Sequence, residues 1–447
     1  MKPQILHLHN IGKIRRAAIR LDGLTVITGK NDTGKSTVGK TVFSLIKAFS
    51  RYKEDFRIDK QSEIEEILDK IYFEVHPDFF EQKEGYGIFK SVFLPPVLLE
   101  KLSPYLTAGG MSDDEARLIL KPYYEFIDNR IRPEFKKRFF DYLDKIKEIL
   151  ISGPAKKDYV YSALNKAFSS EFLMEILPRT IPSTEGSIRY MSGVQTLIDL
   201  QVRNDKLSVK EMAEEEINGY FKDVTYMENP VYIQIANLIS EADTLWTADL
   251  SKERQLSVLR PKTYMHIKDL VNKLLLSRYF VAEGNEKVSH FLNELRKILS
   301  GSYYYKEEEG VFTFKNVTGK ELHAVNTASG SKTFGVLQLL LMAGAFSNDS
   351  LVVMDEPENY LHPEWQVLFA SLITELADYG FHILINTHSP YMLQALKHFA
   401  EKNGNMSVVK FYLAEKEADG MVVMKDVTAN LDPVFRSLAE PFNKIMW

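Results

Sequence analysis

The sequence lacks cysteine, and this absence excludes two kinds of stabilising site. None of its 447 residues can form a disulfide or supply a thiolate to zinc. It also lacks a long apolar segment: the longest nearly apolar run, Val336 to Phe346, has 11 residues and includes Gln338. Such a run is too short to span a bilayer. We therefore expect no membrane segment.

A secretory signal and a charge of one dominant sign are missing as well. The start, "MKPQILHLHN", has neither a long apolar core nor a small-residue cleavage site. A net charge of −5, with 26% charged and 45% apolar residues, is typical of a globular protein. It argues against a generally basic nucleic-acid coat, although a local basic patch stays open. The length favours two or three domains, and we expect a soluble cytoplasmic protein.

What is present begins with strand-like patterns near the start of the chain. Three short alternating segments, Ile5 to Gly12, Ile14 to Leu21 and Leu24 to Gly29, are separated by turn residues. From Lys35 to Phe49 the apolar residues recur at helical spacing. These patterns predict three strands followed by a helix.

Strand patterns return after residue 310. Gly310 to Val325 and Ser407 to Val427 are predicted to form hairpins with turns near Gly319 and Gly420. The apolar runs Ser350 to Glu356 and Phe381 to Pro390 are typical of buried parallel strands joined by a helix. The two ends of the chain therefore predict one α/β core.

The middle of the chain has a different residue pattern. From about 51 to 300, mixed-charge helical stretches are separated by loops rich in proline and glycine, without sustained heptads or a fixed repeat. We predict a head formed by residues 1–50 and 301–425, with 51–300 as a mostly helical inserted domain for sensing or partner docking. Residues 426–447 are predicted to be a C-terminal tail that packs on the head.

The clearest motif is "GKNDTGKST", which fits G-x-x-x-x-G-K-[ST] between a predicted strand and a predicted helix. Its glycines let the backbone N–H groups turn toward phosphate oxygens. In this arrangement the lysine reaches the β- and γ-phosphates and the serine hydroxyl binds Mg²⁺. If the match were only an accidental glycine-rich turn, a strand directly before it and a helix directly after it would not be expected. The predicted ATP-binding residues of this phosphate loop are Gly29, Asn31, Gly34, Lys35, Ser36 and Thr37.

Two polar strand ends follow later in the chain. Asp355 and Glu356 come directly after a buried strand, where the aspartate is predicted to bind Mg²⁺ together with Ser36, and the glutamate to polarise the attacking water. By itself this pair could be a solvated acidic turn. His388 ends the next strand and would emerge at the same sheet edge as a γ-phosphate sensor. The alternative is an ordinary core or surface histidine.

These motifs, in this order, resemble the ATPase heads of the ABC superfamily, and within it the soluble branch that includes SMC, RecF and OLD-family ATPases. In that family a small-residue signature precedes the acidic strand, and "ASGSK", from Ala328 to Lys332, matches its place. The resemblance implies that Ser329 and Gly330 begin a helix that faces the γ-phosphate of ATP in a partner subunit. Ser331 and Lys332 depart from the usual signature.

The resemblance implies ATP and Mg²⁺ as cofactors, ATP hydrolysis and a homo-oligomer assembled around ATP. The segment "EPENYLHPEWQ" is similar to phage-defence ATPases of the Septu and PARIS systems, which implies an anti-phage role. No Asp-x-Asp of a Toprim nuclease occurs, so we expect a separate effector protein, a nuclease or a toxin, to act in trans. The family's magnesium-contacting glutamine is not identified, and Gln195, Gln201 and Gln234 all stay candidates.

Two alternatives remain. A DNA-repair or chromosome-maintenance ATPase of RecF or SMC type would use charged segments such as Arg132 to Phe140 to contact DNA, although such a run is usually a solvated helix face. The ATPase subunit of a membrane transporter is disfavoured by the OLD-like acidic motif and the long insertion.

Overall fold

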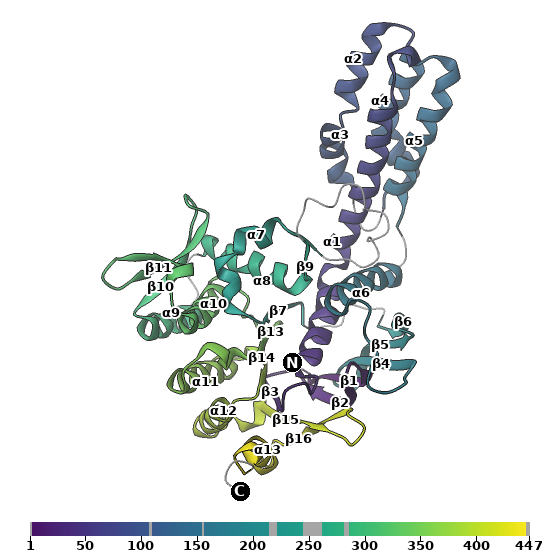
Figure 1. The fold of residues 1–447 in the computed structure, drawn as a ribbon. Coiled ribbons are helices and arrows are strands. Elements are labelled where there is room, and N and C mark those ends of the chain that lie inside the picture. The colour runs from purple at the N-terminus through teal and green to yellow at the C-terminus, as the bar shows by residue number, and fades with distance from the viewer. Residues whose placement is uncertain are drawn as a thin grey trace. The chain divides into compact units, whose positions relative to one another are not determined.

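The structure is a computed structural model that describes residues 2–106, 110–153, 156–213, 221–244, 262–280 and 286–443. Its contacts divide the chain into two compact units. The head unit comprises Met1–Lys47 and Leu164–Trp447, and the helical unit comprises Ala48–Ala163. Helix α1 (Lys35–Glu74) starts in the head unit and continues into the helical unit (Figure 1).

The head unit is built on an eleven-stranded sheet with the order β6-β5-β4-β1-β2-β16-β15-β3-β14-β13-β7. In chain order its strands are β1 (Gln4–Ile11), β2 (Ile14–Arg20), β3 (Leu24–Gly29), β4 (Glu185–Ser192), β5 (Gln195–Arg203), β6 (Lys206–Met212), β7 (Asp223–Met227), β13 (Ser350–Asp355), β14 (His382–Thr387), β15 (Val409–Lys416) and β16 (Val422–Asp426). The predicted α/β fold class is confirmed.

One half of this sheet is parallel. Strands β15, β3, β14, β13 and β7 are parallel neighbours, and every residue of β3 and β13 is buried. Burial on both faces explains their continuous apolar runs. Because parallel strands end at one edge, the residues that follow β3, β14, β13 and β7 emerge together.

The other half of the sheet is antiparallel, and it corrects the predicted domain boundaries. Strands β4, β5 and β6 lie within the segment 51–300 that we expected to be mostly helical, yet they pair with β1 and extend the sheet. Burial in β4 alternates along the strand, as expected for a sheet with one covered face. The inserted unit is therefore shorter than predicted and covers Ala48–Ala163.

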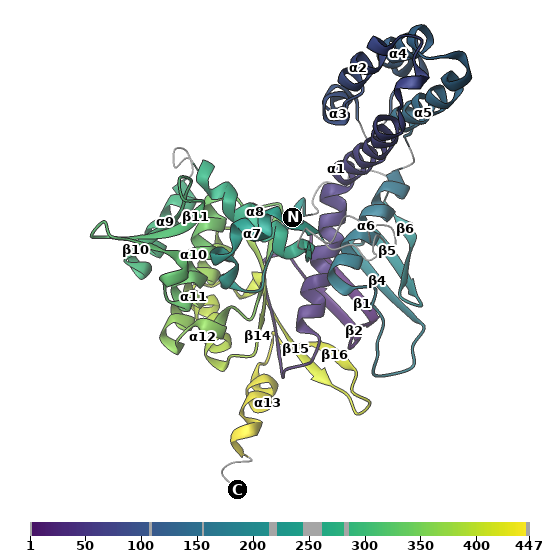
Figure 2. The same cartoon turned by 45° about the horizontal axis from the view of Figure 1, so that its top comes forward.

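Helices cover the parallel half of the sheet, and α10, α11 and α12 lie together on one side of β14 (Figures 1 and 2). The helices of the head unit after α1 are the end of α6 (Lys156–Phe172), α7 (Ala236–Glu241), α8 (Met265–Leu276), α9 (Glu286–Leu299), α10 (Ser329–Met342), α11 (Pro363–Asp378), α12 (Pro390–Lys402) and α13 (Asp432–Asn443). Residues 332–341 of α10 are all buried, which explains its apolar sequence.

Short elements complete the head unit. A three-stranded sheet is formed by β10 (Gly301–Lys306), β11 (Val311–Asn316) and β12 (Glu321–His323), and a small pair by β8 (Asp243–Thr244) and β9 (Lys262–Thr263). The 3₁₀ turns are η3 (Pro230–Gln234), η6 (Ser277–Tyr279), η7 (Ala324–Asn326), η8 (Pro357–Tyr360) and η9 (Met406–Val408). Both predicted hairpins, β11–β12 and β15–β16, are confirmed. In the C-terminal segment Leu431 and Val434 belong to the apolar core, while 444–447 lie outside the described residues.

The helical unit has an apolar core rich in phenylalanine. Its elements after α1 are η1 (Pro77–Phe79), α2 (Lys83–Val92), α3 (Pro95–Leu102), η2 (Ser103–Tyr105), α4 (Asp113–Arg130), α5 (Pro133–Ile151) and the beginning of α6. Phe89 and Phe93 stack with ring centroids 4.2 Å apart. Among the described residues, no helix combines the length and the apolar character that a membrane span requires.

Candidate nucleotide site

The predicted phosphate loop connects β3 to α1, as the motif requires. Gly29 and Gly34 have φ angles of +151° and +78°, a region that glycine adopts most readily. A Cβ atom at Gly29 would also lie 2.8 Å from the carbonyl oxygen of Ala414. The backbone conformation therefore requires glycine at both positions, which supports the prediction of a phosphate loop.

The loop borders a pocket of about 410 Å³. Its lining residues are Gly12, Lys13, Asn31, Asp32, Thr33, Gly34, Lys35, Ser36, Thr37, Glu175, Leu177, Arg179, Thr180 and Glu356. The pocket therefore brings together five of the six predicted loop residues and one predicted catalytic residue from a segment some three hundred residues later. The segment from Glu175 to Thr180 completes the wall, and nothing in the sequence pointed to it.

Lys35 is a buried cation with neutral partners. Its side chain is 5% exposed, and Nζ donates hydrogen bonds to the carbonyl oxygens of Gly29 and Lys30 at 3.2 and 3.1 Å. Burial lowers the pKa of Lys35, while the charges of Glu356, Asp355 and Glu358 oppose that shift. In the described part of the chain no carboxylate forms an ion pair with this ammonium. A phosphate could therefore bind it without breaking a salt bridge.

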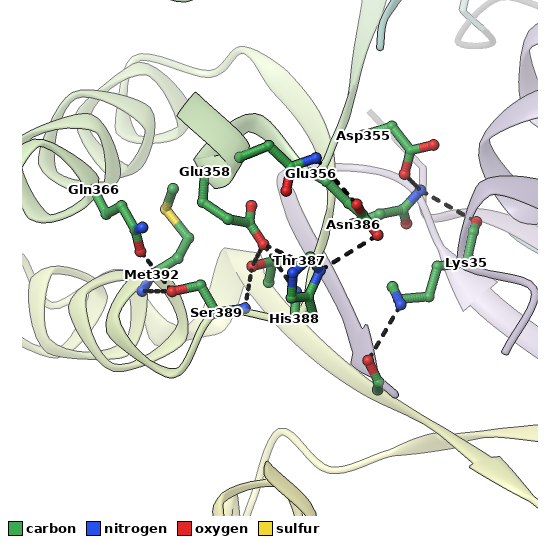
Figure 3. A network of polar contacts seen from close by, with 12 residues as sticks. Lys35, Asp355, Glu356, Glu358, Gln366, Asn386, Thr387, His388, Ser389 and Met392 are labelled. Atoms are coloured by element: carbon green, nitrogen blue, oxygen red, sulfur yellow. Dashed lines mark hydrogen bonds and ion pairs between the residues drawn. The ribbon is translucent and has the colours of Figure 1, made fainter. Parts of the chain in front are cut away.

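Asp355 is held at the end of β13 by two donors, of which Figure 3 shows Asn386. Asn386 donates to Oδ1 at 2.9 Å, and the hydroxyl of Tyr226 donates to Oδ2 at 2.7 Å. Asn386 also donates to the carbonyl oxygen of Lys35 at 3.2 Å. Burial, followed by the charge of Asp355, raises the pKa of Tyr226 well above its usual value, so this phenol stays a donor. The aspartate is fixed beside the start of α1.

The family resemblance implies Mg²⁺, and the oxygen atoms near Asp355 fit that ion. The Oδ1 atom of Asn386 is buried without a hydrogen-bond partner among the described residues, which leaves a free acceptor beside the aspartate. No group of three or more histidine, aspartate or glutamate side chains in the described segments forms a complete metal cage. Mg²⁺ commonly binds one or two carboxylates together with phosphates and water, so this sparse donor set is suitable.

Glu356 adopts an uncommon backbone conformation. Its φ angle is +50°, in the left-handed region, and its N–H donates to the carbonyl oxygen of Asn386 at 2.8 Å. Such a conformation costs a non-glycine residue about 1 to 3 kcal/mol and is concentrated at functional sites. The conformation places Glu356 on the pocket wall, beyond the aspartate. Its Oε1 lies 3.4 Å from Nδ1 of His388, the predicted sensor.

A second glutamate, Glu358, orients the histidine and was not assigned a role from the sequence. It is buried, and Oε1 accepts hydrogen bonds from Oγ1 of Thr387 at 2.6 Å and from the N–H of His388 at 2.9 Å. These bonds, drawn in Figure 3, fix the turn that follows β14. Glu358 belongs to the acidic motif of the sequence, but only the fold shows that Glu358 binds the end of β14.

Ser329 and Gly330 start α10 and do not line the phosphate pocket. Ala328, the cap of this helix, makes no capping hydrogen bond through its side chain, and Ser329 is exposed. A Cβ atom at Gly330 would lie 2.8 Å from the carbonyl oxygen of Tyr360, so the chain needs glycine there. The structure thus separates these two residues from the other predicted ATP-binding residues, and their binding to ATP of a partner subunit stays a prediction.

None of the three candidate glutamines lines the phosphate pocket. Gln195 and Gln201 belong to β5 in the antiparallel half of the sheet, and Gln234 ends η3. On the side away from β14, the neighbour of β13 is β7, and the residue that follows β7 is Glu228. No sequence pattern singles out Glu228, because β7 is short and the strand beside it is distant in the chain.

Comparison with known proteins identifies the family. Residues 1–393 match the family described as "AAA ATPase domain". A comparison with curated proteins finds no match. Among solved structures, the chain is similar to an SMC head bound to the C-terminal winged-helix domain of ScpA, with 12% identity, coverage of 98% of this chain and 100% of that chain, and a TM-score of 0.42.

Two further solved structures show comparable similarity. The SMC head domain from Thermotoga maritima has 11% identity, coverage of 96% and 99%, and a TM-score of 0.36. MJ1267, an ATP-binding cassette of an ABC transporter, has 11% identity, coverage of 98% and 96%, and a TM-score of 0.32. These weak likenesses carry no functional conclusion. The family match spans 393 of 447 residues, and the chain therefore belongs to the AAA ATPase domain family.

Proposed function

We propose that this chain is an ABC-type ATPase that binds ATP with Mg²⁺ at the phosphate loop and hydrolyses it with Glu356. The observation that carries the proposal is that the loop residues and Glu356 line the same pocket. Loop N–H groups and Lys35 hold the phosphates, while Ser36 and Asp355 supply oxygen ligands to the metal. Bound Mg²⁺ supplies positive charge against the phosphate oxygens.

Glu356 is the proposed general base. Its carboxylate faces the pocket, and His388 lies beside it, where the imidazole can contact a γ-phosphate oxygen. Glu358 keeps His388 in place through the backbone of the turn. Water activation and phosphate sensing are thus assigned to neighbouring side chains from successive strands.

The site is proposed to be completed by a second copy of the chain. The N-terminus of α10 is exposed and lacks a side-chain cap, so its N–H groups can donate hydrogen bonds to an anion from outside the chain. Ser329 and Gly330 would there contact the γ-phosphate bound by the partner. This arrangement explains why they lie outside the phosphate pocket of their own chain.

The biological role is proposed to be control of an effector protein in bacterial anti-phage defence, with the effector acting in trans and this chain not itself a nuclease. The helical unit is the proposed docking or sensing surface, and it exposes Phe73 and Leu118 at 77% and 72%. A DNA-repair role is the alternative. Its candidate basic run receives less support, because Lys136 and Arg138 pair with Asp128 and Glu74.

Replacing Glu356 with glutamine tests the proposal. The variant should bind ATP and Mg²⁺ but hydrolyse ATP at least about 10²-fold more slowly, because the water loses its base. It should accumulate as an ATP-bound oligomer, which mass photometry would detect. Glu401→Gln, a change at an exposed site on α12, is the matched control and should hydrolyse normally. Wild-type turnover by Glu356→Gln would refute the assignment of the base.

A further inference from the structure

A second cavity lies on the antiparallel half of the large sheet and shares no lining residue with the nucleotide pocket. Its volume is about 630 Å³, compared with about 410 Å³ for the nucleotide pocket. The walls come from β1, β4, β5, β6 and the loop before β4, and most of the lining side chains are polar or charged. The lining therefore favours a polar ligand, and the proposed mechanism of hydrolysis uses none of these residues.

The cavity contains a buried carboxylate that holds two cations. Asp199 on β5 is 3% exposed. Nε and Nη2 of Arg189 both donate to Oδ2 of Asp199, at 3.1 and 2.8 Å, and Nζ of Lys210 lies 3.9 Å from the same oxygen. The other carboxylate of the lining, Glu185, pairs with Arg203 at 3.1 Å. Asp199 thus compensates only one of the two positive charges and fixes the guanidinium plane of the exposed Arg189.

The positive charge also acts on the neighbouring strand. His7 on β1 is paired with Arg189 in the sheet register, and burial, followed by the charge of Arg189, lowers the pKa of His7. In the next rung of the sheet, His9, Ser187 and Gln201 lie side by side and line the cavity. These side chains add neutral hydrogen-bonding groups beside the cations. A phosphate group carried on a hydroxyl-bearing molecule needs both kinds of partner.

The rim of the cavity is held by Asn10. This residue has a φ angle of +52°, and its Nδ2 donates to the carbonyl oxygen of Glu185 at 3.4 Å. The hydroxyl of Ser183 donates to the same oxygen at 3.0 Å. A Cβ atom at Gly186 would lie 2.6 Å from the carbonyl oxygen of Asn10, so β4 needs glycine there. The rim is therefore ordered before any ligand binds, which lowers the entropic cost of binding.

Two segments run from this cavity directly to the nucleotide pocket. At the end of β1, Asn10 lines the cavity and Gly12 lines the nucleotide pocket. In the segment before β4, Pro182 lines the cavity and Thr180 lines the nucleotide pocket. The N–H of Gly12 donates to the carbonyl oxygen of Ile176 at 2.7 Å, which ties the two segments together.

The β5–β6 hairpin makes a third connection. Its strands carry Gln201 and Lys210, which line the cavity, and its turn carries Asp205. Oδ1 of Asp205 accepts hydrogen bonds from the N–H groups of Ile176 and Leu177, at 2.9 and 2.7 Å. Leu177 lines the nucleotide pocket. A displacement of the hairpin would therefore move a wall of the nucleotide pocket.

We propose that this cavity binds a phosphate monoester with a hydroxyl-bearing body, such as a sugar phosphate or a nucleoside monophosphate, and that the bound molecule changes ATP affinity through the shared wall. Arg189 and Lys210 bind the phosphate, and Ser187 and Gln201 contact the polar body. A sheet face that only meets water would need neither a buried carboxylate nor a fixed rim. The binding itself stands on the cavity alone, whereas the effect on ATP rests on the proposed ATP site.

Binding is tested in the full chain that carries Lys35→Ala, which removes the phosphate loop as a competing site. Ribose 5-phosphate and AMP are the probes, and isothermal titration calorimetry measures their affinity. Adding Arg189→Gln should weaken both probes at least about 10-fold, because the phosphate loses its guanidinium partner. Lys210→Gln should weaken them by a smaller factor. Arg296→Gln, a change at an exposed arginine on α9, is the control and should bind the probes normally.

The effect on ATP is tested in the chain with an intact phosphate loop. Saturating ribose 5-phosphate should change the affinity for a fluorescent ATP analogue about 5-fold or more, a magnitude typical of coupled sites. This change should vanish in Arg189→Gln and persist in Arg296→Gln. Probe binding without any change in ATP affinity would refute the coupling.

Equal affinity of the probes with and without Arg189→Gln would overturn the proposal, as would the absence of binding in the Lys35→Ala chain. If a DNA duplex binds instead and depends on Arg189 and Lys210, this face contacts nucleic acid and the proposed ligand class is wrong. If Arg189→Gln does not fold because Asp199 loses its partner, the exposed Lys210→Gln decides the question. Failure of the wild-type chain to bind the ATP analogue would refute the proposed ATP site, but not probe binding in the Lys35→Ala chain.

Discussion

The nucleotide edge, where Tyr226, Asp355 and Asn386 meet the start of α1, and the start of α10 are built in opposite ways. At the nucleotide edge, side chains from β7, β13 and β14 hold one another and the first turn of α1 through buried hydrogen bonds. At the start of α10, Ser329 is exposed and the cap residue makes no side-chain hydrogen bond. Buried polar groups are preorganised by their partners, whereas an uncapped helix end still has N–H groups to satisfy. We interpret the first region as a complete half-site and the second as a half-site that needs another molecule.

The largest effect is expected at the complete half-site. Lys35→Ala should remove most ATP binding, because the ammonium is the main side-chain charge that faces the phosphates. Equilibrium binding of labelled ATP measures this. Lys425→Ala, which removes an exposed lysine paired with Glu415, is the control and should retain full affinity. Near-normal affinity of Lys35→Ala would mean that the loop is not the nucleotide site.

The next prediction separates the two regions. Ser329→Arg should bind ATP almost normally and yet lose hydrolysis, because its own phosphate pocket is intact while the site of its partner lacks the start of α10. Rates of phosphate release and ATP affinity, measured in parallel, test this. Ser208→Arg on β6 adds the same charge at an exposed site and should hydrolyse normally.

Mixing Ser329→Arg subunits with Lys35→Ala subunits tests both regions in one assembly. In a mixed dimer one composite site combines an intact phosphate loop with an intact α10, and the other carries both defects. Random pairing makes about half of the dimers mixed, so up to about a quarter of wild-type turnover should return if the sites act independently. Hydrolysis at the wild-type rate by Ser329→Arg alone would reduce this segment to an ordinary helix start.

The smallest effect is expected from His388→Ala. Turnover should fall about 10-fold while ATP affinity changes little, because the histidine lies beside Glu356 but is not one of the residues that line the phosphate pocket. Steady-state hydrolysis and equilibrium binding give the two values. His398→Ala, an exposed histidine on α12, is the control. Loss of folding or of ATP binding in His388→Ala would favour the alternative that His388 is an ordinary core histidine.

Local patterns were sufficient for much of the fold. The run of apolar residues in β13, the glycine-rich loop before α1 and the turn at Gly420 each depend on residues adjacent in the chain. The periodic patterns for the first three strands and both hairpins are confirmed for the same reason. The alternation in β4 is also local, but its pairing with β1, about 180 residues earlier in the sequence, leaves no local signal.

The phosphate loop, the acidic strand end and the α/β class could be predicted from the residues alone, because a backbone that curls around phosphate or crosses a buried sheet restricts the residues at each position. Which side chains support them depends on the fold. Tyr226 reaches Asp355 across 129 residues, and Asn386 reaches Lys35 across 351. The contact between Tyr226 and Asp355 depends on the pairing of β7 with β13. Strand order brings such groups together, and no local pattern along the chain records that order.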